Sequence, residues 1–313
     1  MIIQGFAREY KRLAKHSLDK RFGRLQIPVI QHGNAKPHCF AAARPAYLFR
    51  KAILIANFNS PNRGDRFPGI LRPRSAGDAF VTLFCLWWAL LGLFALFPQI
   101  DLAVANMFFL PQQCPAPAKP NQICGIFPYG ADPSMKLLRE IFFQIPYVVA
   151  AVLVWMLFRC WQHHGATFNA LRARNLKIAL GSLLIGPVLI VNLWLKAFSG
   201  RPRPRQTDLF GGALDFVQAG SFAGKCVSNC SFISGEAASA GWLFCLIFII
   251  PQPLRLTVAL PIAAVSLLIP ALRVAFGAHY LSDAVLGWLS SVVVFAALLA
   301  LSQTTHNRRI SEN

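Results

Sequence analysis

The stretch from Leu256 to Ser302 reads LTVALPIAAVSLLIPALRVAFGAHYLSDAVLGWLSSVVVFAALLALS, with an apolar run on either side of the polar segment RVAFGAHYLSD. The runs at 256–272 and 284–302 are long enough to cross a bilayer, which takes roughly 17–25 residues in a helix. Pro261 and Pro270 would break a helix in water, but membrane helices tolerate proline where neighbouring groups satisfy the freed backbone. This stretch therefore predicts two membrane-spanning helices joined by a polar loop.

Further apolar runs precede this stretch, at 79–98, 141–158, 178–195 and 237–252. The chain of 313 residues is 55% hydrophobic and 14% charged, with a mean hydropathy of +0.48. Such a composition is too apolar for an ordinary soluble domain. Pro251 and Pro253 leave only a tight connection between the fourth and fifth runs, so these two should form a helical hairpin. The sequence predicts an all-α, polytopic membrane protein with six transmembrane helices.

Basic residues concentrate in alternate segments between the predicted helices. Residues 1–76 hold 15 Lys or Arg against three acidic residues, which is +12 of the net charge of +19. The 159–177 loop holds four Lys or Arg and no acid, and the tail contains Arg308 and Arg309. Since cytoplasmic segments of membrane proteins carry an excess of Lys and Arg, both termini should be cytoplasmic. We expect a basic N-terminal segment at 1–76, a membrane domain at 77–303, a tail at 304–313 and periplasmic loops at 99–140, 196–236 and 273–283.

The charge of residues 1–76 is better explained by topology than by nucleic-acid binding, because no basic run interleaved with stacking aromatics occurs there. The segment also lacks the short charged region and apolar core of a signal peptide. Phe6, Tyr10 and Leu13 share one helical face among basic residues, which could form an interfacial helix on anionic lipid. The favoured interpretation is a loosely ordered tail.

The 196–236 loop carries more positive charge than a periplasmic loop should. Five basic residues in it face three acidic ones, although the loop is predicted to be periplasmic: Lys196, Arg201, Arg203, Arg205 and Lys225 against Asp208, Asp215 and Glu236. An anionic substrate would explain positive charge on that side of the membrane.

Residues suited to binding phosphate occur at the outer ends of three predicted helices. Lys196, Arg203 and Arg273 could surround a phosphate, since arginine makes forked contacts to its oxygens. Ser234 can donate its hydroxyl, and Gly235 lets the backbone approach closely. A helix begins at this point, and its unpaired N–H groups attract anions.

His279 and Asp283 are four residues apart, so they share one face if a helix begins near them. Asp283 could then accept a hydrogen bond from one imidazole nitrogen and leave the other as a nucleophile, as in a catalytic triad. A single His–Asp pair at a helix start is more often a cap. Here the spacing, order and predicted side of three separate segments agree, which favours catalysis.

The three segments together resemble the tripartite signature of the type 2 phosphatidic acid phosphatase (PAP2) superfamily over residues 79–302. The first motif, Lys-x6-Arg-Pro, is complete at Lys196, Arg203 and Pro204. The third, Ser-Arg-x5-His-x3-Asp, is present except that Leu272 replaces serine. The second, Pro-Ser-Gly-His, departs most, because Ile233 replaces proline and Glu236 replaces histidine.

This resemblance implies a metal-independent, six-helix lipid phosphatase in the bacterial inner membrane, with no cofactor and its site in the periplasm. It implies a phosphohistidine on His279 and a membrane lipid phosphate as substrate. Members of the superfamily act on lipid A, undecaprenyl pyrophosphate or phosphatidylglycerol phosphate. The Ser-Gly-Glu form is most similar to bacterial lipid A phosphatases.

Glu236 occupies the position of the family's general acid, a histidine that protonates the leaving group. The sequence has six histidines besides His279, and the predicted topology places none of them outside: His16, His32, His38, His163, His164 and His306. Glu236 is therefore the favoured acid, and such catalysis typically contributes 10²–10⁴-fold. The alternative is that Glu236 only pairs with an arginine.

Two other functions stay open. The phosphoryl group could pass to another lipid hydroxyl instead of water, or the chain could be an inactive lipid-phosphate binder in which Glu236 marks lost catalysis. The intact His279–Asp283 pair argues against inactivity. Metal-dependent hydrolysis is least favoured, because the outer loops lack a paired acidic motif suited to Mg²⁺.

Four cysteines lie in predicted outer loops, with Cys114 and Cys124 in one loop and Cys226 and Cys230 in another. The periplasm is oxidising enough for disulfides. Pairing within each loop is the simplest of three connectivities, and four free thiols are the alternative.

Overall fold

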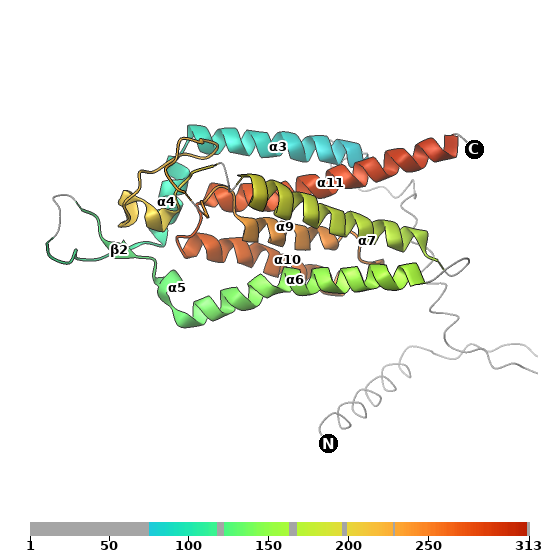
Figure 1. The fold of residues 1–313 in the computed structure, drawn as a ribbon, viewed down its shortest axis with the longest axis horizontal. Helices are drawn as coiled ribbons and strands as arrows, with labels where there is room; N and C mark the ends of the chain where they lie inside the picture. The colour runs from blue at the N-terminus through green and yellow to red at the C-terminus, as the bar shows by residue number, and fades with distance from the viewer. Residues whose placement is uncertain (1–74, 118–121, 163–167, 196–198, 228, 312–313) are drawn as a thin grey trace, which may run out of the picture. The chain divides into compact units, whose positions relative to one another are not determined.

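The computed structural model describes residues 75–117, 122–162, 168–195, 199–227 and 229–311. The expectations for the N-terminal segment and for Lys196 fall outside these ranges. Within them the protein is mostly helical, with almost no strand (Figure 1). It is a polytopic helical membrane protein.

Among the described residues, five helices are long and apolar enough to cross a membrane. They are α3 (Ala76–Leu96), α6 (Pro133–Gln162), α7 (Ala170–Leu183) continuing into the π-helix η2 (Leu184–Leu195), α10 (Gln252–Ala275) and α11 (Leu281–Ser311). Side-chain caps fix two of the starts, because Ser75 accepts from the N–H of Asp78 and Asn169 from that of Arg172. Helix α11 extends well into the segment that was predicted to be a cytoplasmic tail.

The fourth predicted span corresponds to α9 (Gly235–Leu246), a helix of 12 residues. That is too short to cross a bilayer alone, so a count of six spanning helices is not confirmed. Helix α9 is buried along most of its length and packs against α10, α11 and η2 (Figure 1). Gly241 permits the close approach to α11, because a Cβ there would lie 2.1 Å from the carbonyl oxygen of Trp288. Trp242 ties α9 to α7 by donating to the carbonyl of Ala179.

The short elements gather at the end of the bundle where α3, η2 and α10 end and where α6, α9 and α11 begin (Figure 1). They are α4 (Gln99–Met107), the antiparallel pair β1 (Leu110–Pro111) and β2 (Gly125–Ile126), α5 (Pro128–Ala131), η3 (Pro204–Gln206) and η4 (Asp208–Phe210). A cluster of aromatic side chains from Phe109, Phe127, Phe210 and Tyr280 binds these elements together. The three predicted outer loops therefore share one end of the bundle.

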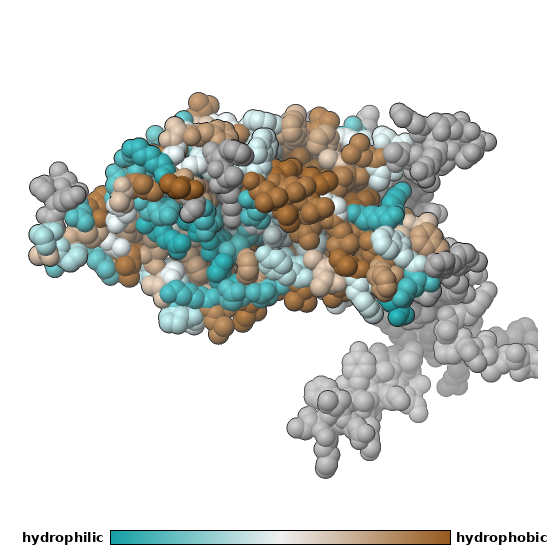
Figure 2. Space-filling view, viewed as in Figure 1, coloured by the Kyte–Doolittle hydropathy of each residue, from teal (hydrophilic) through white to brown (hydrophobic). Residues whose placement is uncertain are grey.

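Both cysteine pairs lie in the loops at this end. Cys114 is disulfide-bonded to Cys124, and Cys226 to Cys230, which is the pairing within each loop. Apolar side chains cover much of the helices' outer surface, and hydrophilic residues gather toward the end that carries α4 (Figure 2). Exposed apolar side chains of this kind, such as Trp88, Trp155 and Leu260, suit contact with lipid.

Candidate active site

His279 lies in the short connection between α10 and α11 and is buried, with 2% of its surface exposed. Its Nδ1 is 2.8 Å from the backbone carbonyl oxygen of Ser231. A carbonyl can only accept, so Nδ1 donates and the lone pair of the neutral ring sits on Nε2. The ring is thus held in the tautomer that a nucleophilic Nε2 requires.

Asp283 does not make the direct hydrogen bond to His279 that the spacing suggested. Its Oδ2 is 4.0 Å from Nδ1 of His279, because other donors occupy the carboxylate. Oδ2 accepts from the Ser231 hydroxyl at 2.5 Å and from the Tyr280 N–H at 3.0 Å, and Oδ1 accepts from Arg201 at 2.6 Å. Asp283 therefore acts on the imidazole through Ser231, whose hydroxyl binds the carboxylate and whose carbonyl binds the ring.

Arg201 sits between two carboxylates and has no exposed surface. Its Nη1 donates to Asp283 and to the Ser282 hydroxyl, and its Nη2 donates to Asp101 of α4 at 2.8 Å. The guanidinium also lies over the Tyr280 ring, 4.4 Å from its centre. Burial lowers the pKa of Arg201, but the carboxylates of Asp283 and Asp101 outweigh burial and raise that pKa. This network locks α4, the 199–234 loop and the start of α11 together.

Arg203 and Arg273 are the predicted phosphate-binding cations that the structure describes. Arg203 is buried and donates to the backbone and side-chain oxygens of Asn229. Burial and the neighbouring Arg205 lower the pKa of Arg203, while Glu236 counters them, so these charges lie close together. The buried Nε of Arg273 has no hydrogen-bond partner within the part of the chain that the structure describes.

Ser234 and Gly235 lie at the start of α9, as the sequence suggested. The Ser234 side chain caps the helix by accepting from the N–H of Ala237. Gly235 is needed for packing as well, since a Cβ there would lie 2.4 Å from the amide oxygen of Asn192. These two residues therefore fix the start of α9, whose second residue is Glu236.

Glu236 is paired with two arginines. Its Oε1 accepts from Arg139 Nη2 at 2.5 Å and its Oε2 from Arg139 Nε at 3.2 Å, a forked contact. Arg273 Nε lies 3.4 Å from Oε1. The side chain of Glu236 is 14% exposed, against 29% for Arg139. The cluster of Glu236, Arg139 and Arg273 is thus partly open at its edge.

Sequence reasoning missed four residues of this arrangement: Arg139, Asp101, Arg201 and Ser231. Arg139 could have been found, because a cation beside a membrane span at the same end as the other cations is a functional signal. Arg201 was noted only as one of several charges in its loop. No sequence motif points to Asp101 or to the backbone carbonyl of Ser231. Within the described ranges, no group of three His, Cys, Asp or Glu residues is placed to hold a metal ion.

A family model described as the PAP2 superfamily matches residues 175–307, which include all three motifs. A lipid A 4'-phosphatase of Rhizobium etli is 60% identical over 247 residues, which are 79% of this chain and 96% of that protein. A lipid A 4'-phosphatase of Rhizobium leguminosarum is 62% identical over 230 residues, which are 74% of this chain and 99% of that protein. A lipid A 4'-phosphatase of Francisella tularensis subsp. novicida is 33% identical over 121 residues, which are 37% of this chain and 54% of that protein.

A solved PAP2-type phosphatidylglycerolphosphate phosphatase from Bacillus subtilis is similar at 14% identity and a TM-score of 0.45, covering 72% of this chain and 96% of that one. The two Rhizobium proteins match along almost their whole length at 60% identity or more, and the family model spans every motif of the site. This chain therefore belongs to the PAP2 superfamily.

Proposed function

We propose that this chain removes the 4'-phosphate of lipid A at the periplasmic face of the bacterial inner membrane, by way of a phosphohistidine on His279. The chain is a multi-pass membrane phosphatase of the PAP2 superfamily that hydrolyses a phosphomonoester. Lipid A is favoured among the candidate substrates because both Rhizobium relatives are lipid A 4'-phosphatases. The basic segments that alternate along the chain support the periplasmic placement.

The observation that carries the mechanism is the 2.8 Å contact between Nδ1 of His279 and the Ser231 carbonyl. With Nδ1 donating, the Nε2 lone pair attacks phosphorus, the N–P bond forms, and the bond between phosphorus and the lipid oxygen breaks. The positive charge that develops on the ring is stabilised by the Ser231 carbonyl and by the Asp283 carboxylate 4.0 Å away. Water then attacks phosphorus and gives a proton to the Glu236 carboxylate, the N–P bond breaks, and inorganic phosphate leaves.

Arg203 and Arg273 hold the phosphate in this proposal, and Lys196 and the Ser234 hydroxyl join them. Buried arginines stabilise the charge that builds up on the phosphoryl oxygens more strongly than they would in water. The Nε of Arg273 supports this role, because it approaches Glu236 at 3.4 Å but makes no hydrogen bond within the described residues, and a bound phosphate oxygen could accept one from it.

Glu236 is the proposed general acid, although its carboxylate is paired with Arg139 and Arg273. In this proposal a bound phosphate competes for the two arginines and leaves the carboxylate beside the oxygen that departs. The carboxylate takes up a proton from solvent and then donates it to this oxygen. The alternative, a carboxylate that only positions arginines, is separated from this role by a comparison of leaving groups described below.

The direct test is to incubate the purified protein with lipid A, undecaprenyl pyrophosphate and phosphatidylglycerol phosphate. We expect inorganic phosphate from lipid A, and mass spectrometry should show loss of the 4'-phosphate with the 1-phosphate retained. Phosphate found on an acceptor lipid would indicate phosphotransfer instead. Binding of all three lipids without turnover would identify an inactive binder.

A further inference from the structure

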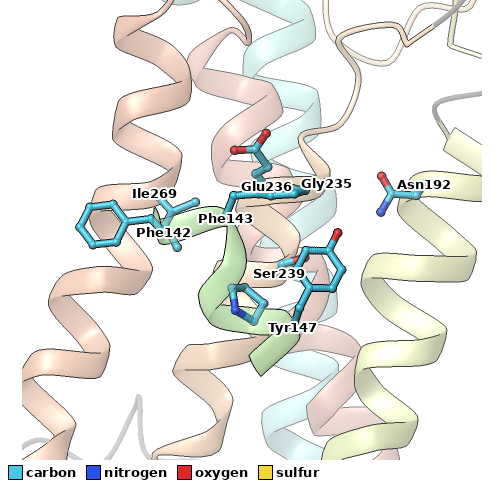
Figure 3. Close-up of a pocket in the computed structure, with 9 residues that line it drawn as sticks. Phe142, Phe143, Tyr147, Asn192, Gly235, Glu236, Ser239 and Ile269 are labelled. Carbon is cyan, nitrogen blue, oxygen red and sulfur yellow. The ribbon is translucent and has the colours of Figure 1, made fainter. Parts of the chain in front are cut away.

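A cavity of about 250 Å³ lies beside Glu236, between α6, η2, α9 and α10 (Figure 3). Its lining consists of Phe142, Phe143, Pro146, Tyr147, Asn192, Gly235, Glu236, Ser239 and Ile269. The volume approaches the lower end of the range for small-molecule sites, roughly 300–1,000 Å³. The cavity is therefore large enough for one compact group and too small for a whole lipid.

Three hydrogen-bonding side chains from three helices line this cavity. Figure 3 shows Tyr147 of α6 and Asn192 of η2 pointing toward one another, with Ser239 of α9 beside them. All three lie in helices that are otherwise strongly apolar. Polar side chains at such positions are costly in a membrane and usually mark a functional site.

The orientation of Asn192 is fixed by its surroundings. Its Nδ2 donates to the carbonyl of Pro187 at 2.8 Å, a contact that spans five residues within the π-helical segment. Its amide oxygen lies against Gly235, where any larger residue would collide with it. The amide is thus held rigidly at the cavity wall.

The rest of the lining is apolar and largely aromatic, with Phe142, Phe143 and Pro146 from α6 and Ile269 from α10. Apolar walls with a few fixed polar groups suit a sugar ring, because its C–H faces pack on aromatic rings while its hydroxyls bind polar atoms. A hydrocarbon chain would offer no hydrogen-bond partner to the hydroxyls of Tyr147 and Ser239 or to the amide oxygen of Asn192, whose Nδ2 already donates to Pro187.

Glu236 connects the cavity to the arginines, because the same residue lines the cavity and pairs with Arg139 and Arg273. A phosphate held by the arginines would therefore present its attached group to the cavity. We infer that this cavity is the subsite that binds the sugar ring from which the phosphate is removed. This inference rests on the proposed function, since it assumes that the arginines hold the phosphate being removed.

The test measures binding and not turnover, so that it remains informative if the proposed activity fails. Glucosamine 4-phosphate, glycerol 1-phosphate and inorganic phosphate are titrated onto the full-length His279→Ala protein in lipid nanodiscs. We expect the sugar phosphate to bind at least tenfold more tightly than glycerol phosphate. Equal affinities for these two would overturn the inference, whatever the result for lipid A hydrolysis.

Two substitutions then locate the effect in the same His279→Ala background. Ser239→Leu fills the cavity and Tyr147→Phe removes one hydroxyl from an exposed position. Each should reduce affinity for the sugar phosphate more than for inorganic phosphate, about tenfold more for Ser239→Leu and about threefold more for Tyr147→Phe. Thr257→Leu, on the exposed surface of α10, is the matched control and should change none of the affinities. A uniform loss for all three ligands in both cavity variants would refute the assignment.

Discussion

Two charged clusters at the same end of the bundle differ in how completely their charges are paired. The inner cluster of Asp101, Arg201 and Asp283 has no exposed side-chain surface, and hydrogen bonds satisfy each charged group. The outer cluster of Arg139, Glu236 and Arg273 is partly exposed, and within the described residues the buried Nε of Arg273 makes no hydrogen bond and only approaches Glu236 at 3.4 Å. The inner cluster therefore joins separate parts of the fold, whereas in the proposed mechanism the outer cluster binds the phosphate.

The largest effect is expected when His279, which lies near both clusters, is removed. His279→Ala should reduce phosphate release from lipid A to the background level, because no nucleophile remains. A colorimetric phosphate assay on purified protein in detergent checks this result. Folding is verified by an unchanged melting temperature, and activity near that of the wild type would reject the nucleophile.

The outer cluster is probed next with Glu236→Gln. If Glu236 is the acid, the rate on a sugar-linked phosphate should fall about 10²–10⁴-fold, while nitrophenyl phosphate, whose leaving group departs as an anion, should lose much less. Glu236→His should keep part of the activity, since imidazole does this work in the family's usual motif. Equal losses on the two substrates would leave Glu236 as a partner of the arginines only.

The inner cluster is tested through stability. Arg201→Met should lower the free energy of unfolding by about 3–5 kcal/mol, because it leaves two buried carboxylates without their cation. Thermal unfolding in detergent measures this loss. Arg139→Met is the matched variant from the outer cluster, where partial exposure makes the stability change much smaller. Similar losses of unfolding free energy in both variants would show that the two clusters contribute equally to stability, which contradicts the comparison above.

Arg139→Gln should affect activity more than stability. Losing one charge-assisted contact to the phosphate or to Glu236 should lower kcat/KM for lipid A about 10–100-fold, from a contact worth about 1.5–3 kcal/mol. Arg139→Lys should recover only part of this, since lysine cannot make the forked contact. Wild-type kinetics in Arg139→Gln would remove Arg139 from the site.

The smallest effect is expected at an exposed ion pair in the same loop. Lys225 and Asp215 are about three-quarters exposed and 3.0 Å apart, and exposed pairs contribute little. Lys225→Ala should therefore leave both the melting temperature and kcat/KM unchanged within error. A clear loss of activity would contradict this prediction and show that Lys225 contributes to the active site.

The sequence predicted the helices well because an apolar run of membrane length has few alternatives. The sequence overestimated the length of α9, because its apolar run continues into the turn before Pro251. The small residues of α9 allow this short helix to be buried between other helices. The sequence placed Ser234, Gly235 and His279 near one another because each lies at a helix end, and the helix ends meet.

The sequence could not reveal how Asp283 acts. The four-residue spacing suggested a direct contact with His279, but Arg201, Ser231 and Tyr280 compete for the carboxylate and leave the ring 4.0 Å away. The contact that does orient the ring is a backbone carbonyl, which any residue at position 231 would offer. The apolar run that predicts this helix begins at residue 141 and does not include Arg139, because the first turns of α6, which begins at Pro133, are polar.

The central claim is that His279 carries the phosphoryl group. The most direct measurement is to mix the enzyme with lipid A labelled with ³²P at the 4'-position, quench within milliseconds in alkali, digest, and identify labelled peptides by mass spectrometry. The account predicts an acid-labile, alkali-stable phosphate on His279, which is absent from His279→Ala. Label on another residue, or steady release of phosphate with no labelled protein at any quench time, would contradict it.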